Sequence, residues 1–338
     1  MEHICDTAII AAQNGHDNCL KMLIEVGSNI NAVTDTGHTP LHYAAQKGHD
    51  NCLKTLIEAG SNINAVTDTG NTPLHIAAFN DSNTCNTCVK MFIEAGSNIN
   101  AVNDSGHTPL HYAIMYGRGA CLRMLIEAGS NINAVTDTGH TPLHYAMMYG
   151  HDAYLRMFIE AGSNINAVND TRHTPLHFAI MYGRDACLRM LIEAGSNINA
   201  VTNTGHTPLH YAILYGHDAC LRMLIEAGGN INAVTDTGHT PLHFAVMYDR
   251  AACVILIINK IVLERPLQPS ELCVAPKTSA ALGDVLRTTM RLHGRSEAAK
   301  IIAHMPSDAK DTLRTGVLCL NMRDFPRDLI DSVLVQCV

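Results

Sequence analysis

The sequence predicts an all-α solenoid in which short helix pairs stack on one another, and three observations indicate this fold class. A Thr-Pro-Leu-His tetrad recurs seven times, and neighbouring tetrads lie 33 residues apart, with one interval of 36. Each tetrad begins a stretch whose apolar residues are three and four positions apart, the spacing of one helix face. A turn signal such as Asp-Thr-Gly precedes most of the tetrads. The tetrad prolines are Pro40, Pro73, Pro109, Pro142, Pro175, Pro208 and Pro241.

The first half of each unit predicts a short helix, as the copy at residues 206–238 shows. Thr207 can cap a helix with its hydroxyl, and Pro208 suits the first helical position because the N–H that it lacks has no partner there. An apolar stripe at i, i+3 and i+4 starts at Leu209. Gly216 follows the stripe, so we expect the helix to end there.

The second half predicts another helix and a projecting turn. This helix starts at about Asp218, carries apolar residues on one face and closes at Gly228. The apolar face comprises Cys220, Leu221, Leu224 and Ile225. The turn signal ending at Gly238 then predicts a finger before the next tetrad. One such pair cannot bury its own apolar stripe, so each copy must stack on its neighbours.

The copies at the two ends of the series depart from the pattern. Residues 1–33 lack the full tetrad, as expected of a terminal repeat with one face in water. The extra three residues of the third copy fall within 80–88, and Arg172 replaces one finger glycine. In the last copy Asp249 stands where the stop glycine is expected, and 255–263 is strongly apolar.

On its tetrad and its 33-residue period, the chain resembles the ankyrin-repeat family over residues 1–263. The resemblance implies an ankyrin-repeat α-solenoid of about eight helix-turn-helix repeats with β-turn fingers, without enzymatic activity or cofactor. It also implies a scaffold or adaptor that binds a protein partner on the concave face of the array. We expect a proline-rich linker over 264–278 and a small helical domain over 279–338 that caps the array.

Charge and hydropathy exclude several classes of partner. The formal net charge is −8, and residues 259–338 contribute +2, which leaves the repeats at −10. An acidic array without basic runs argues against nucleic acid and anionic membranes as partners. No signal peptide or membrane-spanning segment is predicted.

The cysteines predict a reducing compartment. Seven of the twelve occupy the same second-helix position in successive copies, where Tyr154 replaces cysteine in one copy. A small buried side chain explains this periodicity, so we expect free thiols and a cytoplasmic or nuclear protein.

The histidines do not predict a metal or catalytic site. Seventeen of the twenty fall at three repeat positions: in the tetrad, directly before it, and in the turn between the helices. Equivalent residues of neighbouring repeats lie on the order of 10 Å apart, whereas metal ligands must lie about 2 Å from one ion. By resemblance, the tetrad histidines form hydrogen bonds within and between repeats.

The first helices of repeats 4 to 8 carry a second apolar stripe, which predicts the partner-binding site. A core needs only one stripe, and exposed Tyr and Met are typical of protein-binding surfaces. The alternative is that the Met side chains pack between adjacent first helices and that the stripe reflects repeat duplication. The predicted partner-binding residues are Met115, Tyr116, Met148, Tyr149, Met181, Tyr182, Leu214, Tyr215, Met247 and Tyr248, with His107, His140 and His206 directly before the tetrads.

The C-terminal segment offers a second hypothesis. The spacing of Leu282, Leu286 and Met290, with Pro306 further on, resembles a SOCS box, and 325–334 resembles the start of an F-box. The resemblance implies docking to elongin or a cullin, as in the substrate-recognition subunit of a cullin-RING ubiquitin ligase. The alternative is that these amphipathic helices only cap the last repeat.

Overall fold

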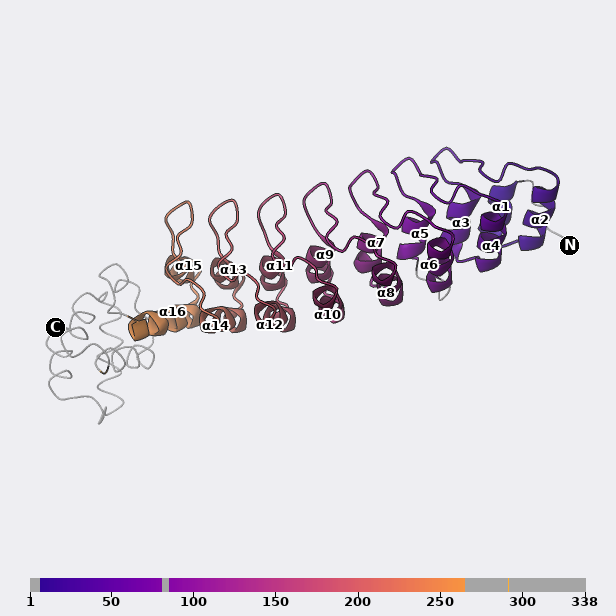
Figure 1. The fold of residues 1–338 in the computed structure, drawn as a ribbon. Helices are drawn as coiled ribbons and strands as arrows, with labels where there is room; N and C mark the ends of the chain where they lie inside the picture. Colours follow the sequence, from indigo (N-terminus) through magenta and orange to yellow (C-terminus); the bar gives the residue numbers. More distant parts are fainter. Residues whose placement is uncertain (1–6, 81–84, 265–290, 292–338) are drawn as a thin grey trace. The chain divides into compact units, whose positions relative to one another are not determined.

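The computed structural model describes residues 7–80, 85–264 and 291, and in these residues all regular structure is helical (Figure 1). The predicted all-α class is confirmed. The helices that begin the repeats are α1 (Ala8–Asn14), α3 (Pro40–Lys47), α5 (Pro73–Phe79), α7 (Pro109–Met115), α9 (Pro142–Tyr149), α11 (Pro175–Met181), α13 (Pro208–Tyr215) and α15 (Pro241–Met247). The second helices are α2 (Asp17–Glu25), α4 (Asp50–Glu58), α6 (Cys85–Glu94), α8 (Gly119–Glu127), α10 (Asp152–Glu160), α12 (Asp185–Glu193), α14 (Asp218–Glu226) and α16 (Ala251–Glu264).

The chain forms two compact units, Met1–Phe178 and Ala179–Val338. Within the first unit each first helix contacts the next, from α1 to α9, and the second helices α2 to α8 do the same. Within the second unit α13 contacts α15, and α12, α14 and α16 contact one another in order. A finger loop projects before each first helix from α3 onward (Figure 1). The helix pairs of each unit therefore stack as the sequence predicts.

From α3 onward, the tetrad begins the first helices through reciprocal hydrogen bonds. At α3 the backbone N–H of His42 donates to Thr39 Oγ1 at 3.4 Å, and the backbone N–H of Thr39 donates to His42 Nδ1 at 3.1 Å. The same capping box occurs at α5, α7, α9, α13 and α15, each with proline at the first helical turn. The tetrad thus satisfies backbone groups that a helix start otherwise leaves unpaired.

Left-handed residues end the first helices and shape the fingers. Gly150 closes α9 with φ 76°. In the finger before α9, Gly139 has φ 74°, and a Cβ there would lie 2.8 Å from the backbone nitrogen of Asp170 in the next finger. Asp249 (φ 51°) and Arg172 (φ 62°) keep the left-handed conformation without glycine. Their backbones are therefore strained relative to those of the other copies.

Tetrad histidines join neighbouring repeats inside each unit, as predicted. Nε2 of His75 lies 3.0 Å from the carbonyl oxygen of His107, and Nε2 of His144 lies 3.0 Å from that of His173. His210 makes the equivalent contact in the second unit, at 3.2 Å from the His239 oxygen. Each of these tetrad imidazoles is fully buried. The histidine of the last tetrad, His243, is exposed.

The repeat cysteines do more than fill the core, which corrects the interpretation of this position as simply apolar. Cys220 Sγ donates to Asp185 Oδ1 of the preceding repeat at 3.0 Å, and Cys253 Sγ donates to Asp218 Oδ1 at 3.1 Å. Burial is the largest cause that raises the pKa of Cys253 to about 12, and the adjacent Asp218 carboxylate is the next largest. The seven repeat cysteines form no disulfide, as expected, and the raised pKa keeps the Cys253 thiol in the unreactive protonated form.

Tyr154 and Gly119 replace this pair in the first unit. Tyr154 occupies the cysteine position of α10, and its hydroxyl donates to the carbonyl oxygen of Gly117 at 2.8 Å. A Cβ on Gly119, at the acceptor position of α8, would lie 3.0 Å from the Tyr154 ring and from its hydroxyl. The larger ring therefore needs the smallest residue opposite it.

The last helix is longer than the other second helices. α16 ends at Glu264, one residue beyond the predicted array boundary. Its buried residues are Cys253, Val254, Ile257, Ile258, Ile261 and Val262. The predicted linker and helical cap lie outside the described residues, as do Leu282, Leu286, Met290 and Pro306.

Candidate protein-binding face

The predicted tyrosines are exposed at the C-terminal ends of the first helices. Their exposed fractions are 48% for Tyr116 and 44% for Tyr149 in the first unit. In the second unit Tyr182, Tyr215 and Tyr248 are 44%, 42% and 42% exposed. Each of repeats 4 to 8 therefore presents one tyrosine to solvent.

The neighbouring apolar residues are only partly accessible. Met115, Met148, Met181 and Leu214 are half-buried, and Met247 is 56% exposed. Both interpretations of these residues therefore stay open, because each side chain divides its surface between packing and solvent.

The three predicted histidines lie between the fingers and the first helices, where each contacts an aromatic ring. His107 Nε2 lies 2.7 Å from the Tyr145 hydroxyl of the next repeat. The ring centroid of His140 lies 5.4 Å from that of Phe178, and His206 lies 5.2 Å from Phe244. Burial lowers the pKa values of His107 and His140. These half-buried histidines support the face and expose only part of the ring.

A row of valines on the fingers was missed in the sequence analysis. Val102 is 60% exposed and Val135 57%, and each stands two residues before a finger aspartate that is also exposed. The second unit repeats the row with Val201 and Val234, at 42% and 59%. The signal was present, because an apolar residue beside a turn in every repeat contradicts a polar finger.

Contacts connect finger and helix within one repeat. In the fifth repeat Thr138 Oγ1 lies 2.7 Å from His140 Nδ1, and the rings of His140 and Tyr145 are 6.0 Å apart. Tyr145 in turn stacks on Tyr149, with centroids 6.0 Å apart and an interplanar angle of 8°. The exposed tyrosine and the finger are therefore parts of one packed surface.

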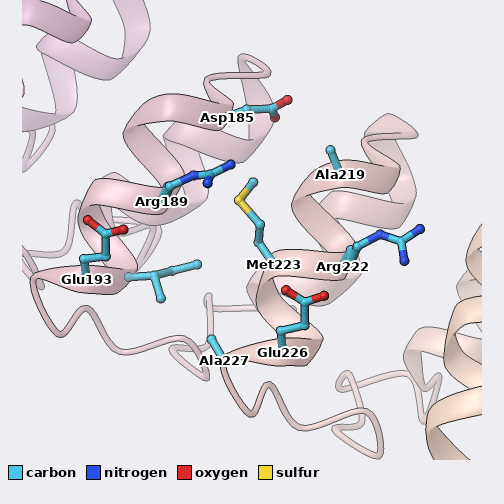
Figure 2. Close-up of a pocket in the computed structure, with 9 residues that line it drawn as sticks. Asp185, Arg189, Glu193, Ala219, Arg222, Met223, Glu226 and Ala227 are labelled. Atoms are coloured by element: carbon cyan, nitrogen blue, oxygen red, sulfur yellow. The ribbon is translucent and has the colours of Figure 1, made fainter.

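A second feature lies on the second helices of the second unit. An open groove of about 530 Å³ runs between α12 and α14, and Figure 2 shows Arg189 and Met223 pointing into it. Its charged lining residues are Asp185, Arg189, Glu193, Arg222 and Glu226. Because charged residues of both signs line it and no exposed aromatic ring does, it is a weaker candidate than the tyrosine rows.

The described part of the chain contains no cluster of three or more His, Cys, Asp or Glu side chains arranged to hold a metal ion. None of the helices in residues 7–80 and 85–264 has the length and apolar character needed to cross a bilayer.

Comparison with known proteins identifies the repeats. A family model of ankyrin repeats, three copies long, matches residues 8–100, 60–136, 82–169, 128–202, 155–235 and 194–265. The chain belongs to the ankyrin-repeat family. Ankyrin repeats are typically protein-interaction modules without enzymatic activity, so the matches indicate protein partners. They lend no support to a SOCS box, an F-box, or elongin and cullin as partners.

Solved structures agree with this assignment, and 578 chains match. One is the ankyrin repeat domain of Bcl-3, a member of the IkappaB protein family. It is 26% identical in sequence with a TM-score of 0.57, and the match covers 62% of this chain and 95% of that chain. Among curated proteins, none matches the sequence.

Proposed function

We propose that this ankyrin-repeat protein is a scaffold that binds a protein partner through the exposed tyrosine rows and the fingers beside them. The observation that carries the proposal is the recurrence of a tyrosine with 42–48% of its surface exposed at the end of the first helix in repeats 4 to 8. Tyrosine is enriched among residues that dominate binding energy, because a rigid ring buries a large area at low entropic cost.

The test compares two faces of the same two repeats. Tyr116→Ala with Tyr149→Ala removes the exposed rings, and Arg123→Ala with Arg156→Ala is the matched control on the second helices, where both arginines are exposed. Each full-length variant is used as bait, and captured proteins are quantified by mass spectrometry. Thermal unfolding confirms that all baits are folded.

We expect the tyrosine variant to lose its main partner while the arginine variant keeps it. Truncation of a dominant interface residue costs about 2 kcal/mol or more, which is roughly a thirtyfold loss of affinity for one ring. Equal capture by the folded tyrosine variant and the unsubstituted protein would reject the proposed face.

The adaptor hypothesis for the C-terminal segment rests on sequence resemblance, chiefly the apolar spacing of Leu282, Leu286 and Met290 with Pro306 further on. It predicts that full-length protein co-purifies elongins and that Leu282→Asp with Leu286→Asp abolishes this. Absence of elongins from the unsubstituted protein would end the hypothesis and leave the scaffold proposal unaffected.

A further inference from the structure

We infer that the tyrosine and finger rows of repeats 4 and 5 bind an extended, basic segment of the partner, which presents one apolar and one cationic residue in every three. This surface, here called the paired-row face, consists of Val102, Asp104, Tyr116, Val135, Asp137 and Tyr149. The inference rests on the proposed function and specifies the chemistry of the partner.

The spacing between equivalent residues of neighbouring repeats sets the spacing of the contact residues in the partner. Backbone hydrogen bonds join successive fingers: the N–H of Asp104 donates to Thr69 O at 3.2 Å, and that of Asp137 donates to Ser105 O at 3.3 Å. The first helices α5, α7 and α9 pack directly on one another, so the rows repeat at about one helix-packing distance, on the order of 10 Å. An extended chain advances about 3.1–3.4 Å per residue, hence three residues per repeat.

The exposed tyrosines of the paired-row face, Tyr116 and Tyr149, pack against other aromatic rings. Tyr116 contacts Phe79 of the preceding repeat, with centroids 5.4 Å apart, and stacks on Tyr112 at 6.2 Å. Tyr149 stacks on Tyr145 in the same way. Rings fixed before binding lose little entropy when an apolar or proline side chain packs on them, and aromatic rows are a recurring surface for polyproline II segments.

The finger row selects for positive charge. Asp104 and Asp137 are exposed. On the second helix α6, in contrast, the carboxylate of Glu94 has the ammonium group of Lys90 beside it at 3.7 Å. Asp137 acts electrostatically on His107, and burial lowers the pKa of this imidazole more than Asp137 raises it. Since His107 is uncharged at neutral pH, the carboxylate is left for a cation from the partner.

A polyproline II segment satisfies both rows together. Its three residues per turn point in three directions, so one residue of each triplet can face the tyrosines and another the aspartates. A helix would need about seven residues to span the same step, which makes a heptad-patterned helix the competing occupant.

The test measures fluorescence anisotropy of labelled peptides with the full-length protein. The probe is five copies of Pro-Leu-Lys. Three comparison peptides are a shuffled sequence of the same composition without the three-residue period, a version with Glu in place of Lys, and a helical peptide with Leu and Lys in heptad spacing.

We expect saturable binding of the probe, at least about tenfold weaker binding of the shuffled peptide, and none of the Glu version. Asp104→Asn with Asp137→Asn should lower the affinity for the probe about tenfold and reduce the salt dependence of its binding, because two exposed charges are removed. The Arg123→Ala and Arg156→Ala control should leave its binding within about twofold.

Equal binding of probe and shuffled peptide, tighter binding of the heptad helix, or no binding of the probe would each overturn the inference. The capture experiment separates this failure from that of the proposed function. If partner capture depends on Tyr116 and Tyr149 while the probe does not bind, only the extended basic segment is wrong. If capture does not depend on these tyrosines, the face itself is wrong.

Discussion

Mild acid should unfold the first unit because of its buried tetrad histidines. Burial lowers the pKa values of His42, His75 and His144 from 6.5 to about 4, and that of His111 to about 3. The folded pKa lies below the unfolded pKa, so the unfolded chain takes up protons first as pH falls. The stability contribution of the neutral imidazoles is complete above pH 6.5 and is lost progressively between 6.5 and about 4.

The size of the effect follows from the same shift. At pH 5, a histidine with a pKa of about 4 when folded and 6.5 when unfolded contributes about 2 kcal/mol less than at pH 7.5. Four such residues in one unit give about 8 kcal/mol, which is comparable to the whole free energy of unfolding of a typical domain. We therefore expect unfolding between pH 6 and 4.5, which begins above the pKa values of about 3.9 to 4.3 at which free carboxylates are half protonated.

Urea unfolding followed by circular dichroism at pH 7.5, 6.5, 5.5 and 5.0 measures this loss. His144→Gln removes one titrating group, so the variant should lose about 2 kcal/mol less than the unsubstituted protein between pH 7.5 and 5.0. The matched control is His243→Gln, at the exposed tetrad position. A free energy of unfolding that stays constant to pH 5, or an equal pH dependence in both variants, would refute the reasoning.

Three further predictions concern stability, and urea unfolding at pH 7.5 measures each. Gly119→Asp should lower the free energy of unfolding by about 1–3 kcal/mol, because the new Cβ would meet the Tyr154 ring. Adding Tyr154→Cys should recover part of this loss, because it restores the acid–thiol pair. Strict additivity of the two free-energy changes would contradict the coupling. Arg172→Gly should stabilise by about 1 kcal/mol because φ is 62°, and a loss of stability would show that the arginine side chain offsets the backbone strain. Ser130→Ala should be neutral or stabilise by up to about 1 kcal/mol because the buried Oγ has no hydrogen-bond partner in the described structure; a loss above about 1 kcal/mol would reveal a bound water.

Much of the fold could be predicted because its signals are local. Thr39, the proline after it and His42 lie within four residues, so the capping box follows from the tetrad itself. The stop glycines follow from the left-handed conformation that ends a helix, and Asp249 adopts it without glycine. Only the backbone strain at Asp249 could not be predicted without the structure.

Contacts between repeats were harder to predict. Asp185 and Cys220 are 35 residues apart, and a buried cysteine at a regular interval is explained equally well without a hydrogen-bond partner. The dependence of Tyr154 on Gly119 can be recognised only when the second helices of neighbouring repeats are compared. Apolar periodicity describes each helix alone, so it does not report what its neighbour must supply.

The candidate site was predicted in part. The exposed tyrosines follow from the rule that one helix stripe suffices for the core, and their positions in the structure agree. The same rule left Met148 undecided, because a side chain at the border of the stripe divides its surface between the two environments. Val135 was missed because the finger was read only as a turn.

The pairing of Tyr154 with Gly119 limits how this array can evolve by module exchange. Near-identical repeats invite unequal recombination, which adds, removes or reorders whole copies. Most junctions in the series would accept any neighbour, since an aspartate or asparagine in one copy meets a cysteine in the next. The tyrosine-bearing copy packs best on a glycine-bearing predecessor, so recombination that separates these two modules would destabilise the array.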